Sequence, residues 1–504
     1  MIESPQGDTR LVSNPESMAN HDVDHLLQPL VFPPDFNIGA ATSDLQTSTP
    51  GSYPGQIAPT DFAALWRTGP ERIPWEIDTD GNPVEIGPDW WNPNRRNAEA
   101  DLNRMYELGI RTARISIEWA RIEPRDGEFD EAAIRRYAQI FNFMKHRGIE
   151  PVIALQHFAL PEWLKDGWHN PRTPELFERY AEKMAIIFGN EEVKKWITLN
   201  EPTGELGGKY FSEYFPPGKR QLRHLPHAVK NMSEANRRAY VAIKRHCPDA
   251  EVGITHAMMW VEPNDPNSTR EKKLASALNW FNNYLPILLI TGKGHYADFL
   301  GVNFYTAHSV SGTHNPRFEK GKSTQERPLR NIPFFNFDYQ GQVPSDFGWT
   351  MAPDSFLRAI REIHQRYPGK VFVTENGYST KGDDDKRKLF FIGHLAAIHK
   401  AISEGIPIRG WHVWSLIKNL EWAQGFDQDF GIIGYGQAER GTRAPRHVRE
   451  SGRFIQRMLQ DTSAEDGVSV RRNRPVLDLR REITALRPEL QEEALHMLRL
   501  VETA

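Results

Sequence analysis

The stretch Trp196-Ile197-Thr198-Leu199-Asn200-Glu201-Pro202 is a short apolar and β-branched run that ends in a carboxylate. A second stretch of the same kind, Val371-Phe372-Val373-Thr374-Glu375-Asn376-Gly377, ends in Glu375. Continuous apolar runs of this length predict strands of a parallel sheet that is buried on both faces. A carboxylate at the C-terminal end of such a strand lies where an α/β barrel builds its active site.

Similar runs recur about eight times along the chain and alternate with longer amphipathic segments. The expected strands are Phe36–Thr42, Thr112–Glu118, Pro151–His157, Trp196–Glu201, Glu251–His256, Phe299–Tyr305, Val371–Glu375 and Arg409–Trp414. The expected helices are Asp130–Arg147, Thr173–Gly189, Ser233–His246, Pro353–Tyr367 and Asp385–Ser403. This alternation implies right-handed βαβ units. Eight such units favour an α/β fold closed into a (β/α)8 TIM barrel with long βα loops over an open doubly wound sheet.

Three regions lie outside this repeat. Residues 1–30 form a polar N-terminal tail, 31–460 the barrel domain, and 461–504 a linker followed by a C-terminal helical extension. The segment Ala307–Thr350 is long enough to indicate a functional or disordered loop. In the extension, five apolar residues fall near one face at helical spacing: Leu490, Ala494, Met497, Leu498 and Val501. This face is expected to pack on the barrel, with self-association into a homo-oligomer as the alternative.

The composition excludes several classes of partner. The net charge is -4, which gives no reason to expect nucleic acid as a ligand. No apolar run approaches the ~18 residues of a membrane helix, and the N-terminus lacks the features of a secretory signal. The single cysteine, Cys247, cannot form an internal disulfide, which suits a reducing compartment. We therefore expect a cytoplasmic protein without a membrane partner.

The two glutamates indicate a reaction. Glycoside hydrolysis needs one protonated carboxyl group to assist the leaving oxygen and one ionised carboxylate opposite it. Two glutamates divide these roles only if their environments separate their pKa values. Arg114 is expected to face inward from the second strand, where its charge would keep one carboxylate ionised. The alternative is a structural salt bridge inside the barrel.

Several motifs occur together and in a fixed order. They are Phe32–Ser43 with Gln46, Arg114–Trp119, His157, Thr198–Pro202, Gly301–Thr306, Val373–Gly377, Trp414–Leu416 and Asn419–Trp422. In these motifs the chain resembles the family 1 glycoside hydrolases, the β-glucosidase-like group of retaining enzymes, over roughly Phe32 to Met458. The resemblance implies that Glu201 is the general acid/base and Glu375 the nucleophile.

The resemblance also implies a set of substrate-binding and supporting residues. Asn200 would hold the sugar 2-hydroxyl and Tyr305 would hydrogen-bond Glu375. Asn303 would support the residues that contact the sugar. The outer hydroxyls of the nonreducing sugar would be bound by Gln46, His157, Glu421 and Trp422, with Trp414 as the platform below the ring. Taken singly, these aromatic residues and His157 would more often belong to the core.

Four positions depart from the family pattern. Leu45 replaces an aromatic residue, Ser48 an acidic one, Phe158 a tryptophan and Lys418 an aspartate. Phe158 puts the usual hydroxyl preference in doubt. Glu421 favours a neutral sugar, because a carboxylate at that position would repel a 6-phosphate.

The sequence thus predicts a retaining β-glycosidase that hydrolyses terminal nonreducing β-D-glycosyl residues through a covalent intermediate. The alternatives are a transglycosylase on the same site and a noncatalytic sugar-binding or scaffold protein. His21 and His25 are four residues apart, but no further ligand accompanies them. We therefore predict neither a metal site nor a cofactor.

Overall fold

The structure is a computed structural model that describes most of the chain. The described residues are 23–48, 57–69, 72–76, 87–92, 96–189, 193–311, 336–340, 342–436, 445–460 and 474–504. Three predictions fall partly outside them: the polar tail up to residue 22 (His21 included), the middle of the 307–350 segment, and the linker at 461–473.

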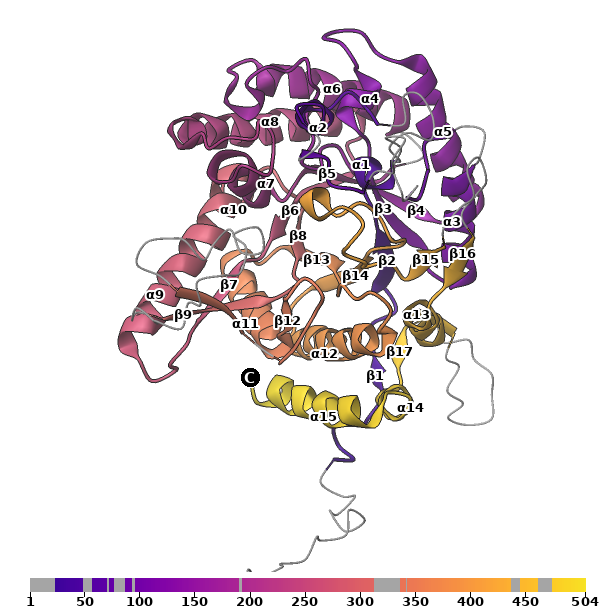
Figure 1. Ribbon diagram of the computed structural model, residues 1–504, viewed down its shortest axis with the longest axis vertical. Coiled ribbons are helices and arrows are strands. Elements are labelled where there is room, and N and C mark those ends of the chain that lie inside the picture. The colour runs from indigo at the N-terminus through magenta and orange to yellow at the C-terminus, as the bar shows by residue number, and fades with distance from the viewer. Residues whose placement is uncertain are drawn as a thin grey trace, which may run out of the picture.

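Eight parallel strands close into a barrel, which confirms the predicted fold class (Figure 1). Around the barrel the order is β13-β14-β2-β3-β4-β5-β6-β8. The strands are β2 (Asn37–Ala41), β3 (Thr112–Ser116), β4 (Glu150–Ala154), β5 (Lys195–Asn200), β6 (Glu251–Ala257), β8 (Phe299–Asn303), β13 (Lys370–Asn376) and β14 (Ile408–Trp414). Each corresponds to one predicted strand. Three of them, β3, β4 and β8, end two or three residues earlier than predicted.

Alternating side chains separate the inside of the barrel from the layer under the helices. On β4, Ile153 joins the large core shared with the helices. Its neighbours Val152 and Ala154 join a smaller cluster with apolar side chains of β5, β8 and β13. Gly301 is required on β8, because a Cβ there would lie 2.5 Å from Thr255 Cγ2 and 2.7 Å from Thr374 Oγ1.

The five predicted helices are present around the barrel. They are α5 (Glu131–His146), α6 (Thr173–Phe188), α8 (Leu225–His246), α11 (Pro353–Arg366) and α12 (Asp384–Ser403). Helix α8 begins eight residues before its predicted start, with Pro226 in its first turn, where the fixed φ of proline suits a helix. The remaining α-helices are α1 (Asp44–Thr47), α2 (Asp61–Trp66), α3 (Asn97–Glu107), α4 (Trp119–Ile122), α7 (Pro202–Leu206), α9 (Thr269–Asn279), α10 (Leu285–Ile290), α13 (Glu450–Gln460), α14 (Leu479–Thr484) and α15 (Pro488–Thr503).

Short helical and strand elements complete the loops at the barrel mouth. The π-helix η4 (Gly207–Phe211) continues α7, and η6 (Trp280–Tyr284) joins α9 to α10. The described ends of the 307–350 segment are strands, since β9 (Ala307–Ser311) pairs with β10 (Asn336–Gln340) and with β7 (Trp260–Pro263). Further pairs are β11 (Gln342–Pro344) with β12 (Thr350–Met351), and β15 (Ile433–Tyr435) with β16 (Arg446–Val448).

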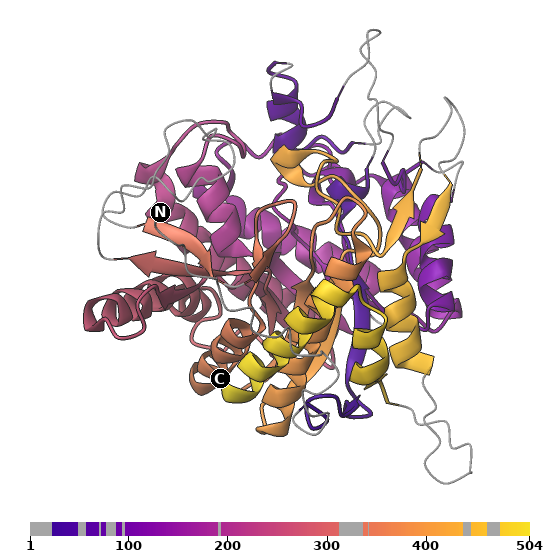
Figure 2. The ribbon, with the colours of Figure 1, turned by 60° about the horizontal axis from the view of Figure 1, so that its bottom comes forward.

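The C-terminal extension packs along α12 (Figure 2). Strand β17 (Val476–Leu477) pairs antiparallel with β1 (Leu30–Val31), so segments from both ends of the chain meet. Helix α15 then packs on α11 and α12. The five apolar residues singled out in the sequence are all buried. Past its charged start, α12 is apolar on several sides, and the barrel covers one face while α15 covers another.

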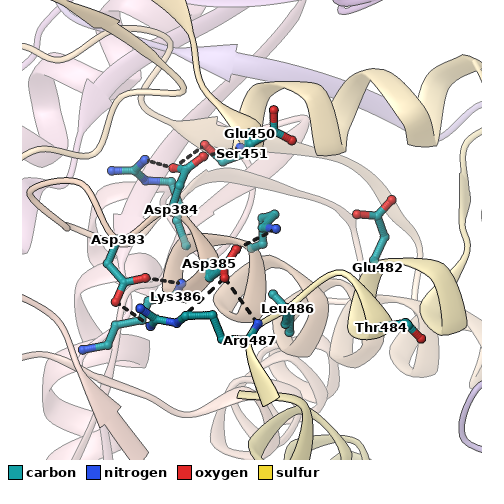
Figure 3. Close-up of polar contacts among 12 residues, drawn as sticks. Asp383, Asp384, Asp385, Lys386, Glu450, Ser451, Glu482, Thr484, Leu486 and Arg487 are labelled. Atoms are coloured by element: carbon teal, nitrogen blue, oxygen red, sulfur yellow. Dashed lines mark hydrogen bonds and ion pairs between the residues drawn. The ribbon is translucent and has the colours of Figure 1, made fainter. Parts of the chain in front are cut away.

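Polar contacts fix the start of α12 between the extension and α13 (Figure 3). The Arg487 guanidinium donates to Asp383 at 2.8 Å, and the Arg487 backbone N–H donates to Asp385 at 3.3 Å. Between them, Asp384 accepts a hydrogen bond from the Ser451 hydroxyl at 3.0 Å. Among the described residues, no helix is both long enough and apolar enough to cross a membrane.

Candidate active site

Both glutamates lie at the C-terminal mouth of the barrel. Glu375 is on β13, in register with Asn303 of β8. Glu201 directly follows β5 and adopts a left-handed backbone with φ of 47°. Pro202 then starts α7. A left-handed φ is costly for a residue with a side chain, and such strain concentrates at functional positions.

Arg114 links Glu375, the candidate nucleophile, to Asn200 at the end of β5. One guanidinium nitrogen donates to Glu375 Oε1 and another donates to Asn200 Oδ1. The Tyr305 hydroxyl donates to the second oxygen of Glu375 at 2.5 Å. Both carboxylate oxygens of Glu375 therefore accept hydrogen bonds, one of them from a fixed positive charge.

Asn303 connects the other glutamate to the same network. Its amide nitrogen donates to Glu201 Oε1 at 2.7 Å, and its amide oxygen accepts from the Thr374 hydroxyl at 2.7 Å. The Thr255 hydroxyl in turn donates to Asn200 Oδ1 at 2.6 Å. Sequence reasoning missed Thr255, which pairs in register with Asn200, and Thr374, which directly precedes Glu375.

The electrostatics of the two glutamates differ. Burial and, to a smaller extent, the charge of Glu375 raise the pKa of Glu201 to about 8, against the lowering effects of Asn303 and Arg114. Glu201 is therefore suited to hold a proton at neutral pH. Burial also raises the pKa of Tyr305 well above its ordinary value, which keeps its hydroxyl available as a donor to Glu375.

The predicted sugar-binding residues gather beside these glutamates. Gln46, on α1, donates from Nε2 to the Leu420 carbonyl at 2.8 Å and to Glu421 Oε2 at 3.4 Å. Glu421 also accepts a hydrogen bond from Trp414, while burial raises its pKa to about 8. The His157 ring stacks with two indoles, with centroids 5.9 Å from Trp414 and 5.8 Å from Trp422.

These contacts form two groups, one around the two glutamates and one around Glu421, and the charges of Glu375 and Glu201 act on the pKa of Glu421. Burial and the positive charge of Arg114 hold the pKa of His157 well below its usual range. The neutral imidazole can then donate to or accept from a sugar hydroxyl. Polar groups around an indole face match a sugar, which has polar edges and apolar C–H faces.

The structure accounts for one departure from the family pattern. Where an acidic side chain is missing at Ser48, Asp44 one helical turn earlier pairs with Arg121 through contacts of 2.7 and 3.0 Å. The Ser48 hydroxyl accepts from the same guanidinium at 3.1 Å. Asp44 thus supplies a carboxylate to the guanidinium that Ser48 also contacts, and sequence reasoning did not anticipate this pair.

The other departures lie at the rim. Leu45 and Phe158 pack in one apolar cluster with Trp422, and the Phe158 ring meets the indole edge-on at 4.9 Å. Lys418 lies over the Tyr435 ring at 5.6 Å. Within the described part of the chain, no three His, Cys, Asp or Glu residues gather in a way that could hold a metal ion.

The sequence and fold have known relatives. The family model described as Glycosyl hydrolase family 1 matches residues 30–297 and 288–463. Beta-glucosidase A of Thermotoga maritima is 28% identical over 480 residues, covering 86% of this chain and 99% of that protein. A beta-galactosidase of Sulfolobus acidocaldarius is 27% identical, covering 80% of this chain and 91% of that protein.

A phospho-sugar enzyme is similarly related. The 6-phospho-beta-galactosidase of Staphylococcus epidermidis is 28% identical, covering 82% of this chain and 96% of that protein. Among solved structures, the family 1 β-glucosidase from Thermotoga maritima has a TM-score of 0.72 at 24% identity, covering 87% of this chain and 100% of that one. That likeness concerns the fold.

Proposed function

The chain belongs to glycosyl hydrolase family 1 and is a retaining β-glycosidase, and on that premise we propose that Glu375 is its nucleophile and Glu201 its general acid/base. The observation that carries the assignment is the unequal setting of the two carboxyl groups. Glu375 accepts hydrogen bonds from Arg114 and Tyr305. Burial instead raises the pKa of Glu201, which leaves that group protonated at neutral pH.

The first step forms the glycosyl-enzyme. A Glu375 oxygen attacks the anomeric carbon, and the bond from that carbon to the leaving oxygen breaks. Glu201 gives its proton to the leaving oxygen, so the departing alcohol is neutral. Tyr305 and Arg114 hold the attacking carboxylate, while Asn200 is placed to contact the sugar 2-hydroxyl.

The second step releases the sugar. Glu201, now ionised, removes a proton from water as its oxygen attacks the anomeric carbon, and the bond to Glu375 breaks. Both carboxyl groups return to their starting states, and two inversions give net retention. This mechanism predicts that the two carboxyl groups lie ~5–5.5 Å apart.

The substrate that we propose is a terminal β-linked neutral sugar. Gln46, His157 and Glu421 would bind its outer hydroxyls, with Trp422 beside them and Trp414 below the ring. Relatives are named for glucosides, galactosides and a 6-phospho-galactoside. Glu421 supports a neutral sugar, because its carboxyl group, protonated at neutral pH, can hydrogen-bond a hydroxyl, whereas a phosphate beside it would oppose its ionisation and would meet a like charge once it is ionised.

A panel of aryl β-glycosides, including 6-phosphoglycosides, tests both proposals. We expect wild type to release the phenol from a neutral sugar, and Glu375→Gln and Glu201→Gln to lose most of that activity. Release from 6-phosphoglycosides alone would contradict the sugar assignment. No observation favours transglycosylation or a noncatalytic role.

Azide rescue separates the roles of the two glutamates. In Glu375→Gly, azide would attack from the vacated face and give the α-glycosyl azide. In Glu201→Gly, azide would attack the glycosyl-enzyme in place of water and give the β-glycosyl azide. The reverse pairing of variant and product would exchange the assignments.

We further propose the domain limits and the compartment. The family match ends at residue 463, which supports a catalytic domain at 31–460 and an added segment at 461–504. Cys247 is a buried free thiol, which supports a cytoplasmic location. Cell fractionation tests the location.

A further inference from the structure

Three charged side chains meet behind Glu201, on elements that the sequence analysis did not connect. Lys209 lies on η4, Glu205 on α7 and Asp61 on α2. The Lys209 ammonium donates to Asp61 Oδ2 and lies 3.6 Å from Glu205 Oε1. Glu205 is fully buried, and the Lys209 side chain is 5% exposed.

Each carboxylate also holds another part of the site. Glu205 accepts from Gln156 Nε2 at 2.8 Å and from Trp168 Nε1 at 2.7 Å. Gln156 immediately precedes His157, one of the sugar-binding candidates. Asp61 Oδ1 accepts from the Leu160 backbone N–H at 3.0 Å, which anchors the loop that follows His157.

The same group is tied to Glu201 through the backbone. The Glu205 N–H donates to the Glu201 carbonyl at 2.9 Å, and the Asn200 N–H donates to the Gln156 carbonyl at 3.0 Å. A rotation of α7 would therefore move Glu201 and strain the contacts of Glu205 together. Because the Glu201 side chain itself touches Asn303 alone among the hydrogen bonds found in the described residues, its direction depends on how α7 is held.

Such a group costs free energy to build. The free energy lost when charged groups leave water is offset only when the ion pairs have good geometry and the remaining polar atoms are hydrogen-bonded. Burial raises the pKa of Glu205 to about 7, and the charge of Lys209 is the main opposing influence. Without Lys209, two acidic groups would face each other without a counter-charge, and the α7–α2 contact would loosen.

We propose that Lys209 is a positioning residue for the acid/base step: it ties the helix that begins at Glu201 to the loop that carries His157, through Glu205 and Asp61. This inference rests on the proposed role of Glu201. The three residues touch neither the reacting atoms nor the predicted sugar-binding groups, so they act through α7 and the loop.

The leaving group of the substrate distinguishes this role from a purely structural one. A 2,4-dinitrophenolate leaves without a proton, whereas a phenolate needs proton transfer from the acid. A misplaced Glu201 would therefore slow the phenyl glycoside far more than the dinitrophenyl glycoside. General loss of folded enzyme would lower both rates by the same factor.

The experiment compares kcat/KM for both glycosides of the preferred sugar in Lys209→Met and wild type. We expect a loss of about tenfold on the phenyl glycoside, part of the ~10²–10⁴ that a positioned acid supplies, and under about twofold on the dinitrophenyl glycoside. Lys388→Met is the matched control, because Lys388 is also 5% exposed and pairs with Asp385 at 2.8 Å on α12. In this control the ratio of the two kcat/KM values should be the same as in wild type.

Two further variants keep the test decisive. Glu201→Gln should lose still more kcat/KM on the phenyl glycoside than on the dinitrophenyl glycoside. An equal loss on both substrates in this variant would overturn the role of Glu201 itself. If Glu201→Gln loses more on the phenyl glycoside and Lys209→Met loses equally on both substrates, the inference about Lys209 is wrong. Glu205→Gln, which removes one acceptor with little change of shape, should reproduce the selectivity if Lys209→Met does not fold.

Discussion

Asn303 is the residue that relates the two glutamates to each other. Its amide nitrogen donates to Glu201 and its amide oxygen accepts from Thr374, the residue before Glu375. A single side chain thus links Glu201 to the residue beside Glu375. Its hydrogen bond also favours the ionised form of Glu201 and partly offsets the effect of burial on the pKa.

Replacing Asn303 should therefore move the pH profile. In Asn303→Ala the pKa of Glu201 loses a lowering influence, so the basic limb of kcat/KM, which we expect near pH 8 in wild type, should move to higher pH. The expected shift is about one pH unit, since a hydrogen bond to a charged group contributes roughly 1.5 kcal/mol and one pKa unit corresponds to about 1.4 kcal/mol. Asn279→Ala, a buried asparagine between α9 and β7, is the control. A limb that stays in place or moves to lower pH would contradict the role of Asn303.

Glu421 gives a second prediction at this scale, for stability against pH. Its folded-state pKa is raised from 4.5 to about 8, so its contribution to the free energy of unfolding is present below about pH 4.5 and is lost as the pH rises to about 8. Glu421→Gln does not titrate. The Tm of the variant minus the Tm of wild type should therefore be larger at pH 8 than at pH 5. Thermal unfolding at the two pH values checks this, and a constant difference in Tm would refute it.

The sequence allowed the motif residues of the site to be predicted, but not Lys209. Glu201, Glu375 and Arg114 stand in motifs whose order along the chain carries information. Lys209 stands in no such motif, and its partner Asp61 lies 148 positions away in the sequence. Nothing local in either stretch indicates that a folded barrel brings the two together.

At the scale of elements, the strands were predictable and the short helices were not. Buried parallel strands require continuous apolar runs, and those runs are visible in the sequence. Helix α1 spans only Asp44–Thr47 and exists because buried groups hold it. Besides Arg121, Asp44 accepts from the Tyr137 hydroxyl of α5, and its backbone N–H donates to the Ser116 hydroxyl at 2.8 Å.

The position of the acidic group on α1 can be tested by moving it. Asp44→Ser breaks a buried ion pair and should lower the free energy of unfolding by about 3–5 kcal/mol. It should also raise KM, because α1 carries Gln46. Adding Ser48→Glu places a carboxylate beside the same guanidinium and should recover most of both losses. Chemical denaturation and steady-state kinetics measure them.

Ser48→Ala is the control for this exchange. It removes one hydrogen bond to Arg121 and should cost only about 1 kcal/mol. If the double variant is no more stable than Asp44→Ser and its KM is no lower, the contribution of Asp44 does not come from its charge.

At the scale of the whole molecule, the C-terminal extension completes the cover of the barrel. The spacing of apolar residues indicated a helix with one buried face, and left open whether the barrel or a second copy covers that face. In the structure α15 lies on α11 and α12. Met497 reaches the surface of α12 at Gly393, where a Cβ would lie 3.2 Å from its sulfur.

A charge in this contact should detach the extension. Ala494 is fully buried, so Ala494→Glu should lower the free energy of unfolding by about 3 kcal/mol or more. His496→Glu, on the exposed side of the same helix, should change it by no more than ~0.5 kcal/mol. Thermal unfolding with size-exclusion chromatography checks both. A fall in apparent mass in Ala494→Glu would instead assign the face to self-association.

The pairing of β1 with β17 has a consequence for synthesis on the ribosome. Leu30 faces Leu477 and Val31 faces Val476, so β1 waits for a strand that is translated far later. At ~5–20 residues per second, roughly 20–90 seconds separate the two. Until then β1 has an open edge and α12 an uncovered apolar face, which are features that chaperones bind. A nascent chain that stops before Val476 keeps both features, so the late pairing separates it from a chain in which the C-terminal extension has docked.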